Sequence, residues 1–288
     1  MEYGFLNINK PANCTSHDVV ATLRKSIGIK RIGHSGTLDP FATGVLVIGI
    51  NEATRLFEYL PSDKVYIANI TFGTETDTND ITGKIIRESN YIPLLEEIKE
   101  KLKDLTGRIK QKPPIFSAIK INGHRAYKLA RENKISEDNI DERTVEIYSI
   151  KIISYSSKDL QVEIHCSSGT YIRSIARDLG KLLNSCAVLS NLQRVNAGKF
   201  TIDNSVSLDS INKLTLKEHL ISPISALQLQ KIYLDPKQVE DISFGKEIKV
   251  LETYNSMPLQ LLDNNNRLIA IGTLTKDCIL KPKKVFLK

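Results

Sequence analysis

Hydrophobic and polar residues alternate with a period of two in parts of the chain, which is the pattern of a β-strand with one buried face. The segment KVYIANITF at 64–72 carries on one face Tyr66, Ala68, Ile70 and Phe72. The segments TVEIYSIKII at 144–153 and LQVEIHC at 160–166 have a similar character. We therefore expect three strands here.

Hydrophobic residues recur at helical spacing in three other segments, 15–27, 93–107 and 171–182. The first begins with a T-x-x-D pattern that is typical of a capping box. A proline opens the second segment and a glycine ends it. The third contains Gly180, which is unfavourable inside a helix. The spacing predicts three helices.

Strands and helices are interleaved without regular βαβ spacing, and several strands alternate rather than being apolar throughout. This favours an α+β domain with a largely antiparallel sheet over residues 1–230. After KIYLDP the chain changes to short strand patterns with turn signals such as FGK and DNNN. We therefore expect a small all-β module over 231–288.

The overall composition is that of a folded protein that does not span a membrane. Of 288 residues, 41% are hydrophobic and 25% are charged, which excludes disorder for most of the chain. The longest uncharged apolar stretch, 45–50, is too short to cross a bilayer, and MEYGFLNINK does not resemble a secretory signal. We expect a cytoplasmic location. The net charge of +7 modestly favours a polyanionic partner.

The motifs of metal and nucleotide sites are missing from the sequence. The four cysteines, Cys14, Cys166, Cys186 and Cys278, form no C-x-x-C pair. The run GVLVIG is not followed by the lysine of a phosphate-binding loop. The segment 77–88 faintly resembles a calcium loop, but an isoleucine stands where an oxygen ligand belongs. We expect neither a metal nor a cofactor.

The segment RIGHSGTLDPFATGVLVIG combines a glycine-rich loop with a single carboxylate. Asp39 precedes Pro40, which disfavours a helical conformation, and its neighbours Leu38 and Phe41 are apolar. A lone Asp-Pro pair is most often a simple turn. The alternative is a partly desolvated carboxylate that takes part in chemistry.

Five blocks of the sequence resemble the bacterial TruB-type tRNA pseudouridine synthases, in family order and at family spacing. They are KPANCTSHDVV, IGHSGTLDPFATGVL, YIANITFGTETDTNDITG, QKPPIFSAIKINGHRAY and HCSSGTYIRSIARDLG. The resemblance implies isomerisation of uridine 55 in the T-loop of tRNA. It also implies a pseudouridine synthase catalytic domain with an RNA-gripping insertion at about 108–134, and a PUA-like RNA-binding domain over 231–288.

The resemblance assigns three residues to catalysis. Asp39 matches the family's nucleophile, Arg173 the arginine that pairs with it, and Tyr66 the tyrosine that stacks on the target uracil and is a candidate for removing the C5 proton. A carboxylate suits a nucleophile that must leave again. Attack on C1′ of the ribose and addition to C6 of the base both stay open.

The resemblance also implies residues that bind the RNA. His34 matches a histidine that fills or stacks in the space left by the flipped-out uridine. Lys10 is expected to make an active-site or RNA-phosphate contact. In the basic insertion we expect contacts to the RNA from Lys112, Lys120, Arg125 and Tyr127.

Three departures from the family pattern are Asn13, Cys14 and Phe116, which replace a glycine, a methionine and a tyrosine. Asparagine tolerates the left-handed backbone conformation, so we expect the turn at Asn13 to be kept. The expected partner is the T-arm of tRNA, bound by a monomer without a guide RNA. A guide-RNA-dependent relative and a non-catalytic tRNA-binding protein are the alternatives.

Overall fold

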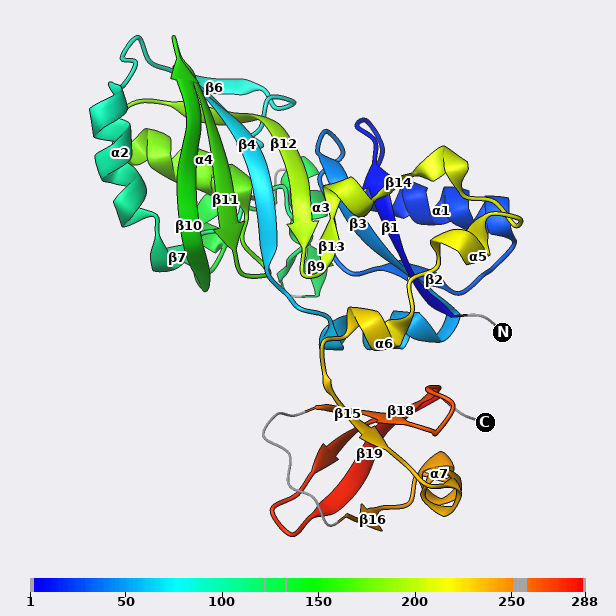
Figure 1. Ribbon diagram of the computed structural model, residues 1–288. Helices are drawn as coiled ribbons and strands as arrows, with labels where there is room; N and C mark the ends of the chain where they lie inside the picture. The colour runs from blue at the N-terminus through cyan, green and yellow to red at the C-terminus, as the bar shows by residue number, and fades with distance from the viewer. Residues whose placement is uncertain (1–2, 122, 133, 251–257, 287–288) are drawn as a thin grey trace.

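The computed structural model describes residues 3–121, 123–132, 134–250 and 258–286, which form a ten-stranded sheet, a five-stranded sheet and two short hairpins (Figure 1). The large sheet has the order β14-β1-β3-β12-β4-β11-β10-β7, with β2 added to β3 and β13 to β12. Its strands are β1 (Gly4–Lys10), β2 (Ile32–His34), β3 (Thr43–Ile50), β4 (Lys64–Phe72), β7 (Gly107–Gln111), β10 (Arg143–Ser156), β11 (Asp159–Cys166), β12 (Ala187–Ala197), β13 (Phe200–Thr201) and β14 (Val206–Ser207).

The predicted α+β class with a largely antiparallel sheet is confirmed. Among the described strands of the large sheet, β1 with β14 and β3 with β12 pair in parallel, and the other pairs are antiparallel. The three strands expected from the alternating segments are β4, β10 and β11.

The half of the large sheet around β1 and β3 is covered on both faces. Leu46 and Ile48 of β3 pack with helix α1 (Ser16–Ile27) in one cluster. Val45 and Val47 pack on the other face with η1 (Asn51–Tyr59) and with part of the C-terminal module. A strand buried on both sides has no polar face, which explains the continuous apolar run in this segment.

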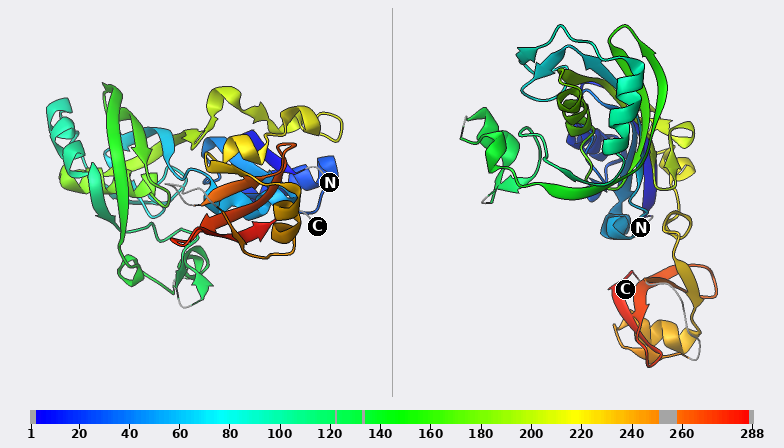
Figure 2. Two further views of the ribbon diagram at one scale, coloured as in Figure 1. Left: turned by 60° about the horizontal axis from the view of Figure 1, so that its bottom comes forward. Right: turned by 90° about the vertical axis from the view of Figure 1, so that its left-hand side faces the viewer.

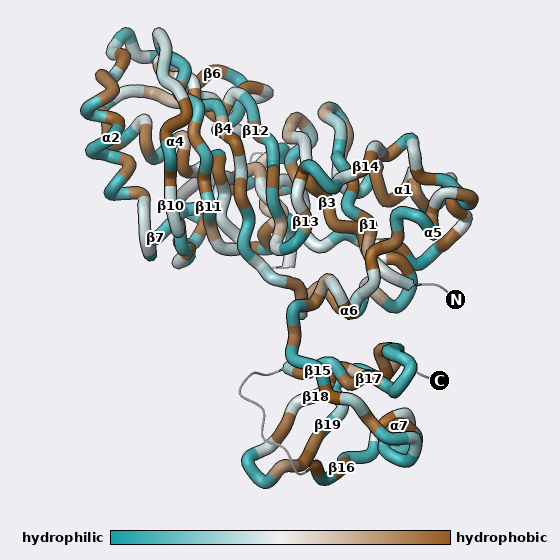
Figure 3. Tube along the Cα trace, viewed as in Figure 1, coloured by the Kyte–Doolittle hydropathy of each residue, from teal (hydrophilic) through white to brown (hydrophobic). Residues whose placement is uncertain are grey.

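The other half of the sheet carries helices on one face. On β4 the predicted inward-facing residues, Tyr66 among them, are buried, and the alternate residues are partly exposed. Helices α2 (Leu95–Asp104) and α4 (Ile172–Leu182) pack against this face. In Figure 3, α2 alternates between hydrophobic and hydrophilic residues along its length, as expected for a helix with one buried side.

The three predicted helices are confirmed, with small changes at their ends. Thr15 caps α1 through its side chain and forms the predicted capping box with Asp18. Helix α2 begins at Leu95 rather than at the proline two residues earlier. Gly180 lies inside α4, and a Cβ there would sit 2.6 Å from the backbone nitrogen of Ala187. The glycine lets α4 approach β12.

The segment that leaves the sheet lies between β7 and β10, so the first residues of the insertion expected at about 108–134 belong to β7, and the segment continues beyond 134. Figure 2 shows this segment projecting away from the sheet in its right-hand view. It contains hairpin β8 (Lys120–Ile121) and β9 (His124–Arg125), helix α3 (Ala126–Arg131) and η2 (Glu137–Asn139). The remaining elements of this part of the chain are β5 (Thr74–Thr76), β6 (Ile85–Glu88), η3 (Ile202–Asn204), η4 (Leu208–Ser210), α5 (Leu216–His219) and α6 (Pro223–Ala226).

The C-terminal module has its own five-stranded sheet, in the order β15-β17-β18-β19-β16. The strands are β15 (Gln230–Tyr233), β16 (Ile248–Lys249), β17 (Leu259–Leu262), β18 (Leu268–Leu274) and β19 (Ile279–Val285). The expectation that this module is all-β needs a correction, because it also contains helix α7 (Pro236–Ser243). Asp235 caps this helix and Gln238 completes a capping box, a start signal that lies in the sequence D-P-K-Q.

Candidate active site

The loop that carries Asp39 is held from several sides by the first residues of the chain. The hydroxyl of Ser16, at the start of α1, accepts a hydrogen bond from the backbone nitrogen of Leu38 at 2.9 Å and lies 3.3 Å from its carbonyl oxygen. The backbone nitrogen of Asn13 donates to the carbonyl of Pro40 at 2.9 Å. Asn13 has φ of 63°, which confirms the predicted left-handed turn. The carboxylate is therefore presented by an ordered loop.

Arg173 binds Asp39 with two parallel hydrogen bonds. Its Nε and Nη2 atoms lie 2.9 Å from the two carboxylate oxygens. Arg173 stands in the first turn of α4 and is only 4% exposed, whereas the side chain of Asp39 is 28% exposed. A bidentate guanidinium–carboxylate pair fixes both position and orientation. One side of the carboxylate is held while the other faces the cavity.

The same guanidinium joins two further segments to Asp39. Its Nη1 donates to the carbonyl of Thr78 at 3.0 Å, and its Nη2 donates to the carbonyl of Phe116 at 3.2 Å. The carboxylate of Asp80, 4% exposed, lies 3.5 Å from Nη1. The sequence analysis gave Asp80 no role, although its segment belongs to one of the five family blocks and was also compared with a calcium loop.

Tyr66 lies in the same cavity as Asp39. It is 8% exposed on β4, opposite Arg194 of β12 and Ile164 of β11 in the sheet register. Burial raises the pKa of Tyr66, and the charge of Arg194 and a hydrogen bond with its side chain oppose that shift. The phenol is therefore protonated at neutral pH.

The cavity has a volume of about 760 Å³ and is bounded by four parts of the chain. The catalytic loop supplies Asp39, the sheet supplies Tyr66 and Arg194, and α4 supplies Arg173. The insertion closes one side with Phe116, Ser117, Ala118 and Tyr127. The structure thus brings together the three residues that the sequence analysis assigned to catalysis.

Lys10 does not fit the expected RNA-phosphate contact. Its side chain is completely buried. The ammonium donates to the carbonyls of Pro11 and Cys14 at 2.8 Å and to that of Pro40 at 3.2 Å. Burial lowers the pKa of Lys10, and the nearby Asp39 carboxylate opposes this shift. In this structure Lys10 ties β1 to the catalytic loop, and it offers no exposed donor to a phosphate.

His34 lies on β2 beside the cavity rather than among the residues that line it. It comes one residue before Ser35, which does line the cavity. Its Nδ1 atom is buried and has no hydrogen-bond partner among the described residues. Burial lowers the pKa of His34, and the positive charge of Arg194 lowers it further. The imidazole is therefore neutral at pH 7.

The expected RNA contacts of the insertion have different environments. Lys120 and Arg125 are exposed on the β8–β9 hairpin, and Arg125 also binds the carbonyl of Ala118. Tyr127 lines the cavity. The carbonyl of Lys112 accepts hydrogen bonds from Ser174 and Arg177 at 2.8 and 2.9 Å, which fastens the root of the insertion to α4.

Sequence reasoning missed three further cations that line the cavity, namely Lys64, Arg143 and Arg194. Burial is the main cause that lowers the pKa of Lys64, to about 8, and the charge of Arg194 adds to it. Arg194 is 2% exposed on β12. The available signal was a charged residue on the buried face of a strand, in the segment LSNLQRV.

The described residues contain no group of three or more His, Cys, Asp or Glu side chains that could hold a metal ion. Cys166 is buried, and burial raises the pKa of its thiol to about 11, so it is not a thiolate at neutral pH. Across the same described ranges, no helix is sufficiently long and apolar to pass through a membrane.

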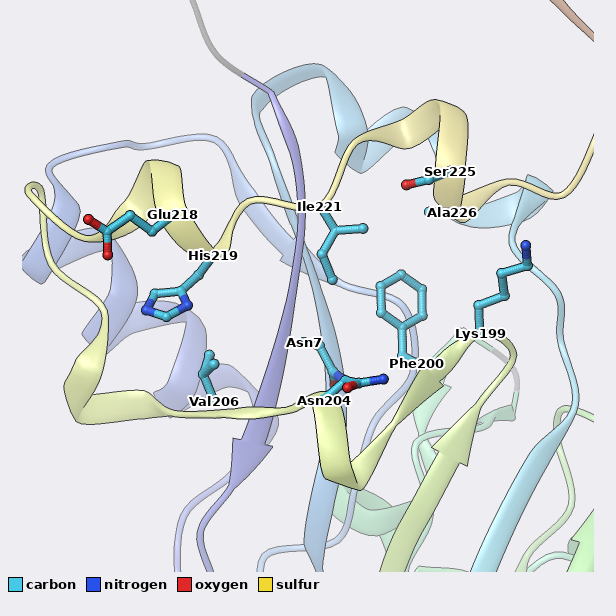
Figure 4. Close-up of a pocket in the computed structure, with 10 residues that line it drawn as sticks. All are labelled: Asn7, Lys199, Phe200, Asn204, Val206, Glu218, His219, Ile221, Ser225 and Ala226. Atoms are coloured by element: carbon cyan, nitrogen blue, oxygen red, sulfur yellow. The ribbon is translucent and has the colours of Figure 1, made fainter.

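A second hollow, of about 440 Å³, lies between β1, β14 and the short helices α5 and α6 (Figure 4). Its polar side chains do not converge on one point. Figure 4 shows Glu218 and His219 on one side of Ile221, with Lys199 and Ser225 on the other. This arrangement offers no set of groups comparable to those around Asp39.

Comparison with known proteins supports the resemblance inferred from the sequence. A profile of TruB family pseudouridylate synthase (N terminal domain) matches residues 24–172. The tRNA pseudouridine synthase B of Borreliella burgdorferi is 42% identical over 274 residues, which cover 94% of this chain and 95% of the relative. That of Acaryochloris marina is 40% identical over 289 residues, which cover 98% of each chain.

Solved structures share the fold at lower sequence identity. One is an H/ACA RNP bound to a substrate RNA containing 2′-deoxyuridine, with 22% identity, a TM-score of 0.74 and coverage of 99% of this chain and 85% of that chain. Another is a Cbf5-Nop10-Gar1 complex, with 24% identity, a TM-score of 0.73 and the same coverage. From the profile match and the extent of identity to the curated relatives, the chain belongs to the TruB family of pseudouridylate synthases.

Proposed function

We propose that the protein isomerises uridine 55 in the T-loop of tRNA to pseudouridine, as a monomer and without a cofactor or guide RNA. The observation that carries the proposal is the bidentate Asp39–Arg173 pair beside Tyr66 in one cavity. Relatives that are 40% and 42% identical over most of the chain are named tRNA pseudouridine synthase B, which supports tRNA as the substrate.

The reaction breaks the bond between C1′ and N1, turns the base, and forms a bond between C1′ and C5. The C5 proton is lost and N1 gains a proton, so no redox step occurs. Asp39 adds to C1′ of the ribose or to C6 of the base and leaves again, while Arg173 keeps its carboxylate in place. Tyr66 stacks on the uracil and is the candidate for removing the C5 proton, since it lines the same cavity as Asp39.

Binding requires the uridine to leave its stacked position, at a cost of a few kcal/mol. The neutral His34 beside the cavity is suited to fill the vacated stack. Lys120 and Arg125 contact the RNA backbone, and Tyr127 contacts the RNA from the cavity wall. The net charge of +7 favours this association.

The test is turnover of an unmodified tRNA transcript, mapped by carbodiimide labelling and primer extension. We expect a new stop at uridine 55 with the wild-type chain and none with Asp39→Ala, at a tRNA affinity within a few-fold of the wild type. The matched control is Asp277→Ala, which removes an exposed carboxylate in the C-terminal module and should react normally. Normal turnover by Asp39→Ala would disprove the assignment of the nucleophile.

The two alternatives give different results in the same experiment. A guide-RNA-dependent enzyme would bind the transcript without modifying it until a guide is added. A non-catalytic tRNA-binding protein would bind it and give no product under either condition. Product from tRNA alone would exclude both.

A further inference from the structure

Arg194 is a buried cation beside Asp39 and Tyr66 that takes no part in the reaction steps proposed above. It lies on β12, is 2% exposed and lines the cavity together with Asp39 and Tyr66. A buried guanidinium is stable only when its donors are satisfied. The acceptors that these donors bind show which parts of the protein the side chain holds in place.

The guanidinium connects three walls of the cavity. Its Nε donates to the carbonyl of Val45 on β3 at 2.7 Å, and its Nη2 donates to the carbonyl of Gly36 at 3.2 Å. Tyr66 is its cross-strand neighbour and lines the same cavity, and the charge of Arg194 opposes the rise in the pKa of the Tyr66 phenol. Gly36 lies three residues before Asp39 in the catalytic loop.

The backbone around Arg194 is fixed as closely as its side chain. Gly44 pairs with Arg194 where β3 and β12 meet in parallel. Gly44 has φ of 100°, and a Cβ there would lie 2.3 Å from the carbonyl oxygen of Arg194. Only glycine permits this approach. Arg194 therefore reaches the loop and Tyr66 from a rigid base.

We propose that Arg194 is a positioning residue of the isomerisation, which holds the Asp39 loop and the Tyr66 hydroxyl in a fixed relation across the cavity. The inference rests on the proposed function. In that arrangement the oxygen of Tyr66 is the acceptor, because a guanidinium has only donors. The hydroxyl proton of Tyr66 then points away from Arg194 and is available to a substrate atom.

This role differs from that of Arg173. Arg173 binds the carboxylate itself, whereas Arg194 binds the backbone of the loop before Asp39 and lies opposite Tyr66 in the sheet register. Loss of Arg194 should therefore misalign two groups without removing the partner of Asp39. Small errors in the alignment of reacting groups reduce rate far more than affinity.

The experiment compares Arg194→Lys, Arg194→Gln and Tyr66→Phe, alone and combined, in single-turnover assays with an unmodified tRNA transcript. We expect each Arg194 variant to lower the rate constant at least tenfold, with the dissociation constant of tRNA within threefold. In the Tyr66→Phe background the same substitutions should cost less, because the hydroxyl is already absent and only the misalignment of the Asp39 loop remains. Leu102→Ala, a core change on α2 outside the cavity, is the control for stability loss alone and should keep the wild-type rate.

A second measurement needs no substrate. If Arg194 holds the Tyr66 hydroxyl, the losses in Tm from Arg194→Lys and Tyr66→Phe are less than additive in the double variant. Additive Tm losses together with equal fold-losses of rate in both backgrounds would overturn the proposal, as would an Arg194→Lys rate within twofold of the wild type. If wild type itself gives no pseudouridine, the proposed function fails, and the Tm cycle alone decides whether Arg194 positions Tyr66.

Discussion

At the scale of single residues, the site gathers positive charge around the carboxylate of Asp39. Lys64, Arg173 and Arg194 line the cavity, and Lys10 lies beneath the loop of Asp39. Cations with little access to water create a strong local potential that attracts a phosphate backbone. Each of these cations also binds at least one backbone carbonyl, so the charge that attracts RNA also fixes the site.

The burial of Lys10 leads to a prediction about stability. Lys10→Met removes the donor of three carbonyls, including that of Pro40, and should destabilise the fold by about 2–4 kcal/mol. Chemical unfolding measures this loss. The salt dependence of tRNA binding should stay unchanged, since Lys10 contacts no phosphate. A stable variant with a shallower salt dependence would restore Lys10 as an RNA contact.

Lys64 predicts a pH dependence of stability. Its folded-state pKa of about 8 lies below the usual 10.5, so below pH 8 both states are protonated and the folded state bears the cost of a buried ammonium. Between these values the unfolded state binds more protons, and stability rises with pH. Near pH 7, the free energy of unfolding of Lys64→Met should therefore exceed that of the wild type by about 1–3 kcal/mol.

That gain should shrink as the pH rises from about 8 towards 10.5. Denaturant unfolding of wild type and Lys64→Met at several pH values measures the difference between them. A difference that stays constant across this window would show that Lys64 has an ordinary pKa in the folded protein. Lys246→Met is the control, because Lys246 is exposed and paired with Asp241 at the surface.

At the scale of elements, Gly180 shows packing overriding helix propensity. Alanine in a helix interior is favoured over glycine by about 1 kcal/mol. At Gly180 the added Cβ would meet the nitrogen of Ala187 at 2.6 Å, which forces α4 away from β12. Overpacking of this kind costs about 1–3 kcal/mol, so Gly180→Ala should be destabilising overall.

Thermal unfolding distinguishes the two effects at Gly180, because propensity raises Tm and overpacking lowers it. Activity adds a second readout. Arg173 lies on the same helix, and its bond to Asp39 should loosen when α4 shifts. We expect a lower Tm and slower turnover. An increase in Tm with normal turnover would contradict the close packing of α4 on β12.

The β8–β9 hairpin predicts where the salt dependence of binding arises. Lys120 and Arg125 are exposed on it, and each phosphate contact contributes about one unit to the slope of log affinity against log salt. Lys120→Ala and Arg125→Ala should each lower that slope by about one. Lys99→Ala, an exposed change on α2, should leave it unchanged. A titration of tRNA affinity against salt measures all three slopes.

Local sequence patterns predicted most helices and strands. They did not predict the site residues whose contacts depend on pairing between segments far apart in the chain. The alternation in 64–72 placed Tyr66 on the buried face of β4. The capping box of Thr15 and Asp18 located the start of α1. Arg194 gains its role only because β12 pairs with β4, and Asp80 only because its hairpin reaches Arg173. No local spacing contains those contacts. Helix α7 did have a local start signal, but its eight residues were outweighed by neighbouring strand patterns.

At the scale of the whole molecule, the C-terminal module packs on the rest of the chain through aromatic, ionic and apolar contacts. Phe286 stacks on Tyr3, with 6.1 Å between ring centroids, and lies under the guanidinium of Arg55 at 5.1 Å. Arg55 also donates to the carbonyl of Val285 at 3.0 Å. Figure 1 shows the module below the large sheet, joined to it by one connection after α6.

A substitution of Phe286 therefore tests whether the C-terminal module and the rest of the chain unfold in one cooperative transition. Phe286→Ala removes the stacking with Tyr3 and the cation–π contact with Arg55, a loss of about 1–3 kcal/mol across the interface. Lys284 and an apolar cluster also join the parts, but we expect this loss to weaken the interface enough for the module to unfold in a separate, earlier transition in calorimetry. Phe244→Ala is the control, since Phe244 is 74% exposed in the same module and should leave the profile unchanged. A single cooperative transition in Phe286→Ala would mean that the apolar cluster of Phe5 and Leu262, rather than Phe286, couples the module to the catalytic domain.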